Sequence, residues 1–263
     1  MHICGPAAQY AYSEDRIYTP PDALLPDYLL LAETLGLQRI VFVQPSVYGT
    51  DNTVMLAAME SCPLENRGVA VVKAQVSEAE IESLNQAGVR GVRLNLVDVT
   101  DPHAELPLQK IEQLAVKIAR FDWHIELLLH VDDFPNLDKD LSDLPVEVVI
   151  GHVGYFRPGS SPDNPGFQAL IRLMKSKRCW TKLTAPYRVS SESYPYADTR
   201  PFAEALIEEA SERLVWGSDW PHVRISTQMP NDGELLELFL GWAGNPEITH
   251  RILVENPARL YGF

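Results

Sequence analysis

Short apolar runs recur along the chain, and amphipathic stretches separate them. Each run is brief and almost continuously apolar, as in strands that are buried on both faces of a parallel sheet. The pattern predicts strands at Ile40–Val43, Val69–Val72, Gly91–Leu96, His124–Leu129, Val146–Ile150, Trp180–Leu183 and Arg213–Trp216. An eighth strand would have to be Met1–Cys4, which is short for a strand.

The stretches between these runs have the spacing of helices. Helices are predicted at Asp22–Leu35, Val54–Glu60, Glu78–Ala87, Leu108–Arg120, Gly166–Lys175, Arg200–Ala210 and Asp232–Trp242. Ser77 with Glu80 three residues later is typical of a helix start, and Gly36 and Gly88 stand where helices should end. Regular strand–helix alternation indicates an α/β fold with parallel strands.

The chain has 263 residues, and a single barrel of eight strand–helix units takes about 250. No Gly-rich GxGxxG fingerprint follows the first strand, which argues against a dinucleotide-binding sheet. We therefore expect one domain over residues 1–263, a (β/α)8 TIM barrel that is distorted and has a clipped first strand.

The formal net charge is −14 and the isoelectric point is near 4.9, which argues against nucleic acid as a partner. Because the chain is negatively charged overall, an anionic substrate would need cationic side chains at its binding site. Cys4, Cys62 and Cys179 have no metal-binding or disulfide-framework spacing, so a reducing cytoplasm is expected. No apolar run could span a membrane, and we recognise no secretory signal. The sequence does not determine the oligomeric state, and a homo-oligomer is compatible with it.

Polar side chains follow the apolar runs. They are His2, Gln44, Ser46, Lys73, Arg93, Asn95, His130, His152, Lys182, Arg188, Asp219 and His222. The active site of such a barrel is built at the carboxyl ends of its strands. Histidines, an aspartate and several cations should therefore converge on one rim, which predicts a hydrolytic site.

Several segments carry a family resemblance. They include Val43 to Asn52, Gly88 to Asn95, Gly151 to Gly154, Gly217 to His222 and Glu255 to Ala258. In order and spacing the chain resembles the amidohydrolase-related family, in its 2-pyrone-4,6-dicarboxylate hydrolase and sugar-acid lactonase branch.

The resemblance implies a role for each matching position. Asp219 would be the general base that activates water, and His2 and His152 would polarise the scissile carbonyl. Tyr18, Ser46, Arg93 and Arg188 would hold the substrate and its carboxylates. No metal or other cofactor is expected.

The sequence departs from the family pattern at two places. The first strand of the family carries His-x-His, whereas this chain begins Met1-His2. Either the natural strand begins upstream of Met1, in which case an upstream extension should stabilise the protein, or this chain lacks the first histidine. Pyrone-dicarboxylate hydrolases would also have a second basic residue where Val99 stands, which weakens the inference of a dicarboxylate substrate.

The leading hypothesis is a hydrolase that opens a lactone or 2-pyrone-type ring of a carboxylated small molecule. One alternative is an isomerase of sugar-acid lactones. Another is a hydrolase or decarboxylase that holds Zn2+ through His2, His130, His152 and Asp219. A third is a binding protein for a small acid. Structural interpretations also exist, because His152 could be a core histidine and Arg93 or Arg188 an ion-pair partner.

Overall fold

The structure is a computed structural model that describes residues 1–97, 105–226 and 228–263. A single parallel sheet runs in the chain order β1 to β7. Its strands are β1 (Arg39–Val43), β2 (Glu65–Ala70), β3 (Val89–Asn95), β4 (His124–Leu128), β5 (Val148–Ile150), β6 (Cys179–Leu183) and β7 (Leu214–Trp216). All seven predicted strands are confirmed, each at or within a few residues of its apolar run.

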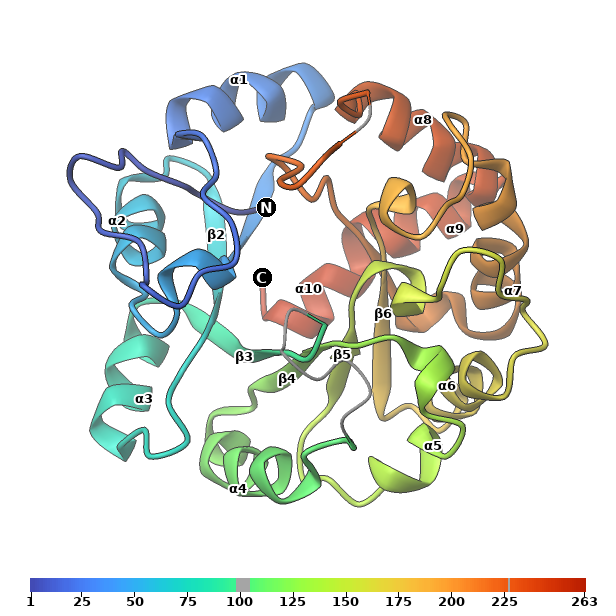
Figure 1. Cartoon of the computed structure of the whole chain (residues 1–263), viewed down its shortest axis with the longest axis horizontal. Helices are drawn as coiled ribbons and strands as arrows, with labels where there is room; N and C mark the ends of the chain where they lie inside the picture. The colour runs from blue at the N-terminus through green and yellow to red at the C-terminus, as the bar shows by residue number, and fades with distance from the viewer. Residues whose placement is uncertain (98–104, 227) are drawn as a thin grey trace.

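Helices surround the sheet on the outside (Figure 1). They are α1 (Leu25–Leu35), α2 (Thr53–Ser61), α3 (Glu78–Gln86), α4 (Leu108–Ile118), α5 (Leu137–Asp140), α6 (Pro165–Lys175), α7 (Arg200–Ala210), α8 (Asp232–Ala243), α9 (Pro246–His250) and α10 (Asn256–Tyr261). The predicted helices are all present. Ser77 caps α3 by accepting a hydrogen bond from the Glu80 N–H, and Gly36 ends α1 in the left-handed conformation.

The first helix begins later than predicted, at Leu25 rather than Asp22. Ala23 is extended because it pairs antiparallel with Cys4, and the Asp22 carboxylate accepts a hydrogen bond from the Ala7 N–H. These contacts with the N-terminal segment hold residues 22 and 23 outside the helix.

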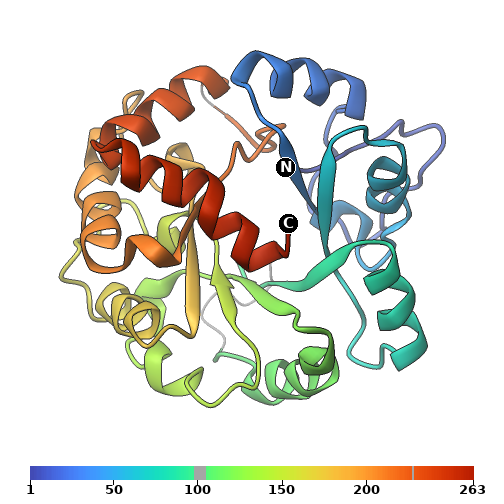
Figure 2. The same cartoon turned by 180° about the vertical axis from the view of Figure 1, so that it is seen from behind.

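The sheet curls around a central axis, and the N-terminus lies inside the ring between its two edge strands (Figures 1 and 2). The Met1 amine donates to the Val41 carbonyl and the Val43 N–H donates to the Met1 carbonyl, so Met1 contacts β1. The His2 N–H donates to the Trp220 carbonyl beyond β7. Met1 and His2 thus connect the two edges of a seven-stranded, curled sheet.

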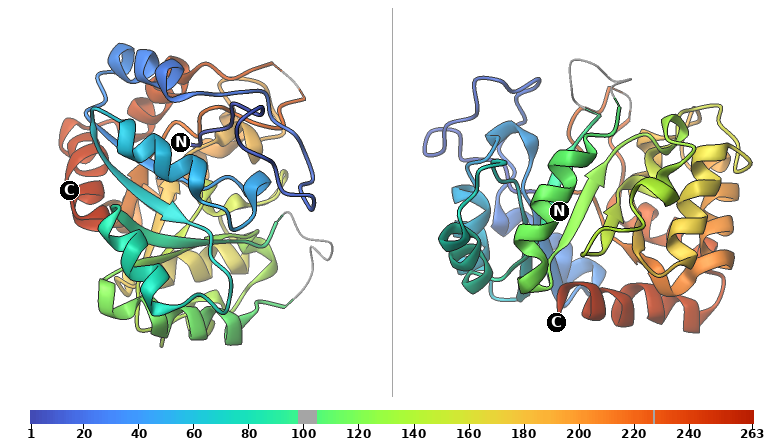
Figure 3. Two further views of the ribbon diagram at one scale, coloured as in Figure 1. Left: turned by 90° about the vertical axis from the view of Figure 1, so that its left-hand side faces the viewer. Right: turned by 90° about the horizontal axis from the view of Figure 1, so that it is seen from below.

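The C-terminal helices cross the end of the sheet where the strands begin (Figure 3). Tyr261 packs edge-on against His124 at the start of β4, and the Gly262 carbonyl accepts a hydrogen bond from Arg67 of β2. These helices cover part of that end, and the site is expected at the opposite, carboxyl end of the strands. No helix in the described part of the chain is long and apolar enough to cross a membrane.

Candidate active site

Asp219 lies just beyond β7 and is the centre of the polar cluster. The residue is buried and adopts φ = 59°, a left-handed conformation that is uncommon outside glycine. His152 and His222 also have positive φ, at 50° and 56°. Strained backbone at several neighbouring polar residues is typical of functional sites, where the surrounding structure fixes side-chain direction at some cost.

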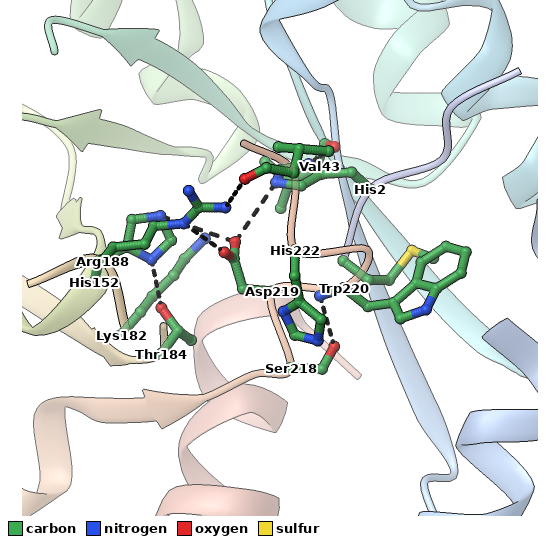
Figure 4. Close-up of polar contacts among 12 residues, drawn as sticks. His2, Val43, His152, Lys182, Thr184, Arg188, Ser218, Asp219, Trp220 and His222 are labelled. Atoms are coloured by element: carbon green, nitrogen blue, oxygen red, sulfur yellow. Dashed lines mark hydrogen bonds and ion pairs between the residues drawn. The ribbon is translucent and has the colours of Figure 1, made fainter. Parts of the chain in front are cut away.

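The two carboxylate oxygens of Asp219 have different surroundings (Figure 4). Oδ2 accepts hydrogen bonds from Arg188 Nε at 2.9 Å and from the Tyr187 hydroxyl at 2.7 Å. Oδ1 faces His2 Nε2 at 3.7 Å and His152 Nε2 at 3.9 Å, distances that leave its lone pairs accessible. Oδ2 therefore holds the side chain in place, and Oδ1 is the oxygen turned toward the two histidines.

The pKa values reflect burial and the local charges. Burial alone would raise the pKa of Asp219, but the positive charge of Arg188 outweighs it and holds that pKa well below its usual value. Burial lowers the pKa of His152 to about 3 and also lowers that of His2, because an imidazolium ion loses its hydration there. Near neutral pH the site thus contains an ionised carboxylate beside two neutral imidazoles.

The hydrogen bonds of the histidines distinguish their ring nitrogens. His2 Nδ1 lies 2.7 Å from the Val43 carbonyl, which can only accept, so Nδ1 carries the proton and Nε2 of the neutral ring is an acceptor. His152 Nδ1 lies 2.8 Å from the Thr184 hydroxyl, which can donate to it. In that arrangement the proton of His152 is on Nε2, which then serves as a donor toward the site.

A second charged cluster lies beneath Asp219 within the ring. Glu126 of β4 is paired with Lys182 of β6, and Arg93 Nε of β3 lies 3.6 Å from its other oxygen. Burial would raise the pKa of Glu126, but Lys182 and Arg93 lower it to about 2. Arg93 is therefore partly neutralised by Glu126, a partner that the sequence analysis missed because it lies inside an apolar run.

Two cavities meet at this cluster. One of about 320 Å3 runs along the gap between β1 and β7, and one of about 40 Å3 opens toward the loops. His2, Arg93, His152 and Asp219 line both. The smaller one is also lined by Tyr18, Ser46 and Arg188, so all seven residues expected to be catalytic or substrate-binding line this one cavity. Asn95, Tyr155 and Arg224 line it as well, and Arg224 lies over the Tyr18 ring at 5.8 Å.

Other residues from the strand ends lie elsewhere. Lys73 is exposed and lines neither cavity. Gln44 is buried and donates to the Asp51 carbonyl, a structural contact. Val99, where a second basic residue would stand in pyrone-dicarboxylate hydrolases, lies outside the described residues.

The four residues of the alternative zinc set are not all brought together. His130 Nδ1 lies 2.7 Å from the Tyr155 carbonyl, its ring stacks on the Tyr155 ring, and it lines neither cavity. Across residues 1–97, 105–226 and 228–263, no group of three or more His, Cys, Asp or Glu side chains is arranged to hold a metal ion. Arg188 also supplies positive charge at Oδ2, which disfavours a second cation there.

Comparison with known proteins identifies the class to which this fold and site belong. The amidohydrolase family model matches residues 1–263, so the chain belongs to the amidohydrolase family, as the sequence motifs predicted. Among curated relatives, the 2-pyrone-4,6-dicarboxylate hydrolase of Comamonas testosteroni is 35% identical over 99% of this chain and 88% of its own length. The 4-sulfomuconolactone hydrolase of Hydrogenophaga intermedia is 36% identical over 100% of this chain and 87% of the relative.

Solved structures agree with this assignment. A protein from Acinetobacter baumannii, named a "probable 2-pyrone-4,6-dicarboxylic acid hydrolase" and solved with citric acid bound, superposes with a TM-score of 0.89. It is 26% identical, and the match covers 100% of this chain and 97% of that one. The chain is a hydrolase of the amidohydrolase class, and its relatives include enzymes that act on lactone rings.

Proposed function

We propose that this protein hydrolyses the lactone or 2-pyrone ring of a small carboxylated molecule, with Asp219 as the general base. The observation that carries the proposal is the asymmetry of Asp219. One oxygen is held by Arg188 and Tyr187, and the other is turned to two neutral histidines at 3.7 and 3.9 Å. The relatives that act on lactones support the choice of bond.

The histidine tautomers define how the water would be held. Asp219 Oδ1 and His2 Nε2 are both acceptors, so they can take the two hydrogen bonds that one water molecule donates. Such a water would direct its lone pairs at the ring carbonyl. His152 can donate from Nε2 to the carbonyl oxygen and stabilise the negative charge that develops there. We therefore assign carbonyl polarisation to His152 and water positioning to His2, which the resemblance had placed beside the carbonyl.

Hydrolysis would proceed through addition of water to the ring carbonyl and collapse of the resulting intermediate. The water oxygen bonds to the carbonyl carbon while its proton passes to Asp219 Oδ1, and the carbonyl electrons move onto the oxygen held by His152. Collapse of this intermediate breaks the bond from the carbonyl carbon to the ring oxygen, which takes the proton back from Asp219. The product is a hydroxyl compound with a new carboxylic acid, which ionises.

The cations around the smaller cavity favour an anionic substrate. Arg93, Arg188 and Arg224 line it, although the chain as a whole carries a charge of −14. Guanidinium groups bind carboxylates through paired N–H donors. We expect a substrate carboxylate to lie against the N–H groups of Arg188 that are not used by Asp219, with Tyr18 and Ser46 at the cavity wall.

The same proposal includes the fold, the metal requirement and the location of the enzyme. Met1–Cys4 would take the place of the eighth strand, which would make the fold a distorted (β/α)8 barrel in one domain. The reaction would need no metal, with Zn2+ as the alternative, and the enzyme would act in the cytoplasm on a small molecule.

A panel of three lactones tests the activity. 2-Pyrone-4,6-dicarboxylate, 4-sulfomuconolactone and D-galactarolactone are incubated with the protein in water enriched in oxygen-18. Hydrolysis places one labelled oxygen in the new carboxylate, whereas isomerisation places none. The isomerase alternative has its own support, since the D-galactarolactone isomerase of Agrobacterium fabrum is 32% identical over 92% of this chain. Tight binding of all three without turnover would contradict both enzymatic functions.

Metal analysis before and after chelation tests the zinc alternative. We expect the rate per mole of protein to be unchanged when bound metal falls to trace levels. A rate that falls with the metal content and returns with added Zn2+ would contradict a metal-independent mechanism.

A further inference from the structure

Arg224 lies in the loop after β7 and lines the smaller cavity together with Asp219. The sequence analysis gave this residue no role. Its guanidinium carbon lies over the Tyr18 ring, 5.8 Å from the ring centre, and Tyr18 lines the same cavity. An aromatic ring attracts a guanidinium group through its π face and does not occupy the N–H donors. The contact with Tyr18 therefore positions a cation at the cavity and leaves its donors for hydrogen bonding.

The backbone before Arg224 is fixed to the catalytic centre. Arg188 Nη2 donates to the Val223 carbonyl at 3.1 Å. The His222 N–H donates to the Asp219 carbonyl, also at 3.1 Å. Asp219, His222 and Arg224 all have a positive φ, at 59°, 56° and 62°. Such a conformation is costly outside glycine and persists only where the surrounding structure holds it. The loop therefore presents Arg224 in a defined position relative to Asp219 and Arg188.

The other two arginines of this cavity already face carboxylates of the protein. Arg188 Nε lies 2.9 Å from Asp219, and Arg93 Nε lies 3.6 Å from Glu126. Glu126 does not line the smaller cavity, and its charge is balanced by Lys182.

The charges around the cavity do not cancel. Among the described residues that line it, the charged ones are three arginines and one aspartate, because the histidines are neutral near neutral pH. Their net charge is +2. A substrate with a single carboxylate would leave one positive charge unbalanced, whereas a substrate with two anionic groups would neutralise the cavity.

We propose that Arg224 binds a second anionic group of the substrate, so that the protein selects lactones with two acid groups over lactones with one; this inference rests on the proposed function. The first acid group lies against Arg188, next to the reacting carbonyl, and the second lies against Arg224 beside Tyr18. Arg224 determines specificity and takes no part in the proton transfers. The assignment differs from the family pattern, in which the second basic residue would stand at the position of Val99.

Arg224 could instead serve only to hold Tyr18 at the cavity wall, and a matched pair of unreactive ligands separates the two roles. Isophthalate carries two carboxylates on one planar ring. Its monomethyl ester has nearly the same shape but a single charge. A residue that binds the second anionic group distinguishes these ligands, whereas a residue that only supports the wall affects both alike.

The variant is Arg224→Gln, which removes the charge and keeps a polar side chain. The matched control is Lys73→Gln. Lys73 follows β2 at the same end of the sheet, is exposed and lines neither cavity. The control therefore removes one positive charge from the same rim and reports the effect of overall charge alone.

Calorimetric titration gives the Kd of both ligands for each protein. Wild type should bind isophthalate roughly tenfold or more tightly than the monoester, the expected size of a hydrogen bond between charged groups. In Arg224→Gln this preference should fall below about threefold, because the second carboxylate loses its charged partner. Lys73→Gln should keep the preference of wild type.

Kinetics with a reactive substrate provide a second readout. The substrate is 2-pyrone-4,6-dicarboxylate, or 4-sulfomuconolactone if wild type opens only that. In Arg224→Gln we expect KM to rise roughly tenfold while kcat stays within about threefold, since the lost contact is equally strong in the ground state and the transition state.

The remaining outcomes overturn the inference or the proposed function separately. A wild type that does not prefer isophthalate overturns the inference. So does Arg224→Gln if it weakens both ligands by the same factor, or Lys73→Gln if it reduces the preference as much as Arg224→Gln does. A wild type whose preference depends on Arg224 but which opens no lactone overturns the proposed function and leaves the binding role of Arg224 in place.

Discussion

Arg188 Nε lies 2.9 Å from Oδ2 of Asp219, so the general base and a cation assigned to the substrate form one ion pair. The side chains of both residues are largely buried, at 15% and 6% exposure. Arg188 also donates from Nη2 to the Val223 carbonyl. Its guanidinium therefore orients Asp219 and fixes the loop after β7, while its remaining N–H groups are available to a substrate anion.

Substituting Asp219→Asn should abolish turnover. The amide keeps the shape of the side chain but cannot accept the proton of water, and lost acid–base help typically costs 10²–10⁴-fold in rate. The rate at saturating substrate tests this, with circular dichroism to confirm the fold. We expect a lower melting temperature as well, because Arg188 loses its counter-charge. Retention of more than about a tenth of the wild-type rate would contradict the role of Asp219.

Substituting Arg188→Lys should raise KM and lower kcat together. Lysine keeps the charge, but a single ammonium group cannot contact Asp219, Val223 and a substrate carboxylate as the guanidinium fork can. Since Arg188 lowers the pKa of Asp219, a weaker pair should raise that pKa and move the acidic limb of the kcat/KM profile to higher pH.

The control for Arg188→Lys is Arg157→Lys. Arg157 pairs with Asp133 at 2.6 Å and lines neither of the two cavities. Its replacement should leave KM and the acidic limb unchanged. If Arg188→Lys only lowers the melting temperature and leaves both kinetic quantities as in wild type, Arg188 is a structural residue.

The sequence predicted the fold well because its strands are buried on both faces. Each of β1 to β7 contains a short, mostly apolar run, so these strands can be recognised without knowledge of their neighbours. The start of α1 was predicted wrongly, because the pairing of Ala23 with Cys4 depends on a contact between distant segments. Local helix signals cannot report such a contact.

The site residues were predicted only from their position after apolar runs. Such a prediction gives the rim on which a residue lies but not the direction of its side chain. Asp219, His152 and Arg188 follow strands, and His2 lies in the N-terminal segment between the two edge strands, so all four line one cavity. His130 also follows a strand, but its ring stacks on Tyr155, a direction that strand position does not determine. Glu126 was missed because its ion-pair partner, Lys182, lies two strands away. The sequence shows only a single carboxylate within an apolar run. Such a carboxylate was nonetheless a signal, since buried charges need partners.

Acid should destabilise the protein through His124, among other groups. Burial lowers the pKa of His124 to about 4, while the unfolded chain binds a proton near the ordinary value of about 6.5. Between those values the unfolded state holds more protons, so stability falls as pH falls from about 6.5 to 4. His124→Leu should reduce the slope of unfolding free energy against pH in this window by up to one proton, measured by urea titration at several pH values. An unchanged slope would show that His124 is not buried as a neutral ring.

Substituting Gly91→Ala should destabilise the sheet near the site. A Cβ on Gly91 would lie 2.4 Å from His124 Nε2, closer than atoms can approach, so His124 would have to move. Gly91 and His124 are partners in the β3–β4 register, and so are Arg93 and Glu126 two residues further along. Overpacking of this kind costs about 1–3 kcal/mol. We therefore expect the melting temperature to fall by roughly 2–10 °C.

Two further variants make the Gly91 test specific. Gly241→Ala, within α8, meets nothing within 4 Å and should be neutral or raise stability by up to about 1 kcal/mol, as alanine favours helices. In a His124→Ala background the obstructing ring is gone, so adding Gly91→Ala should cost far less than it does in wild type. A cost that is equal in both backgrounds would show that the clash with His124 is not the cause.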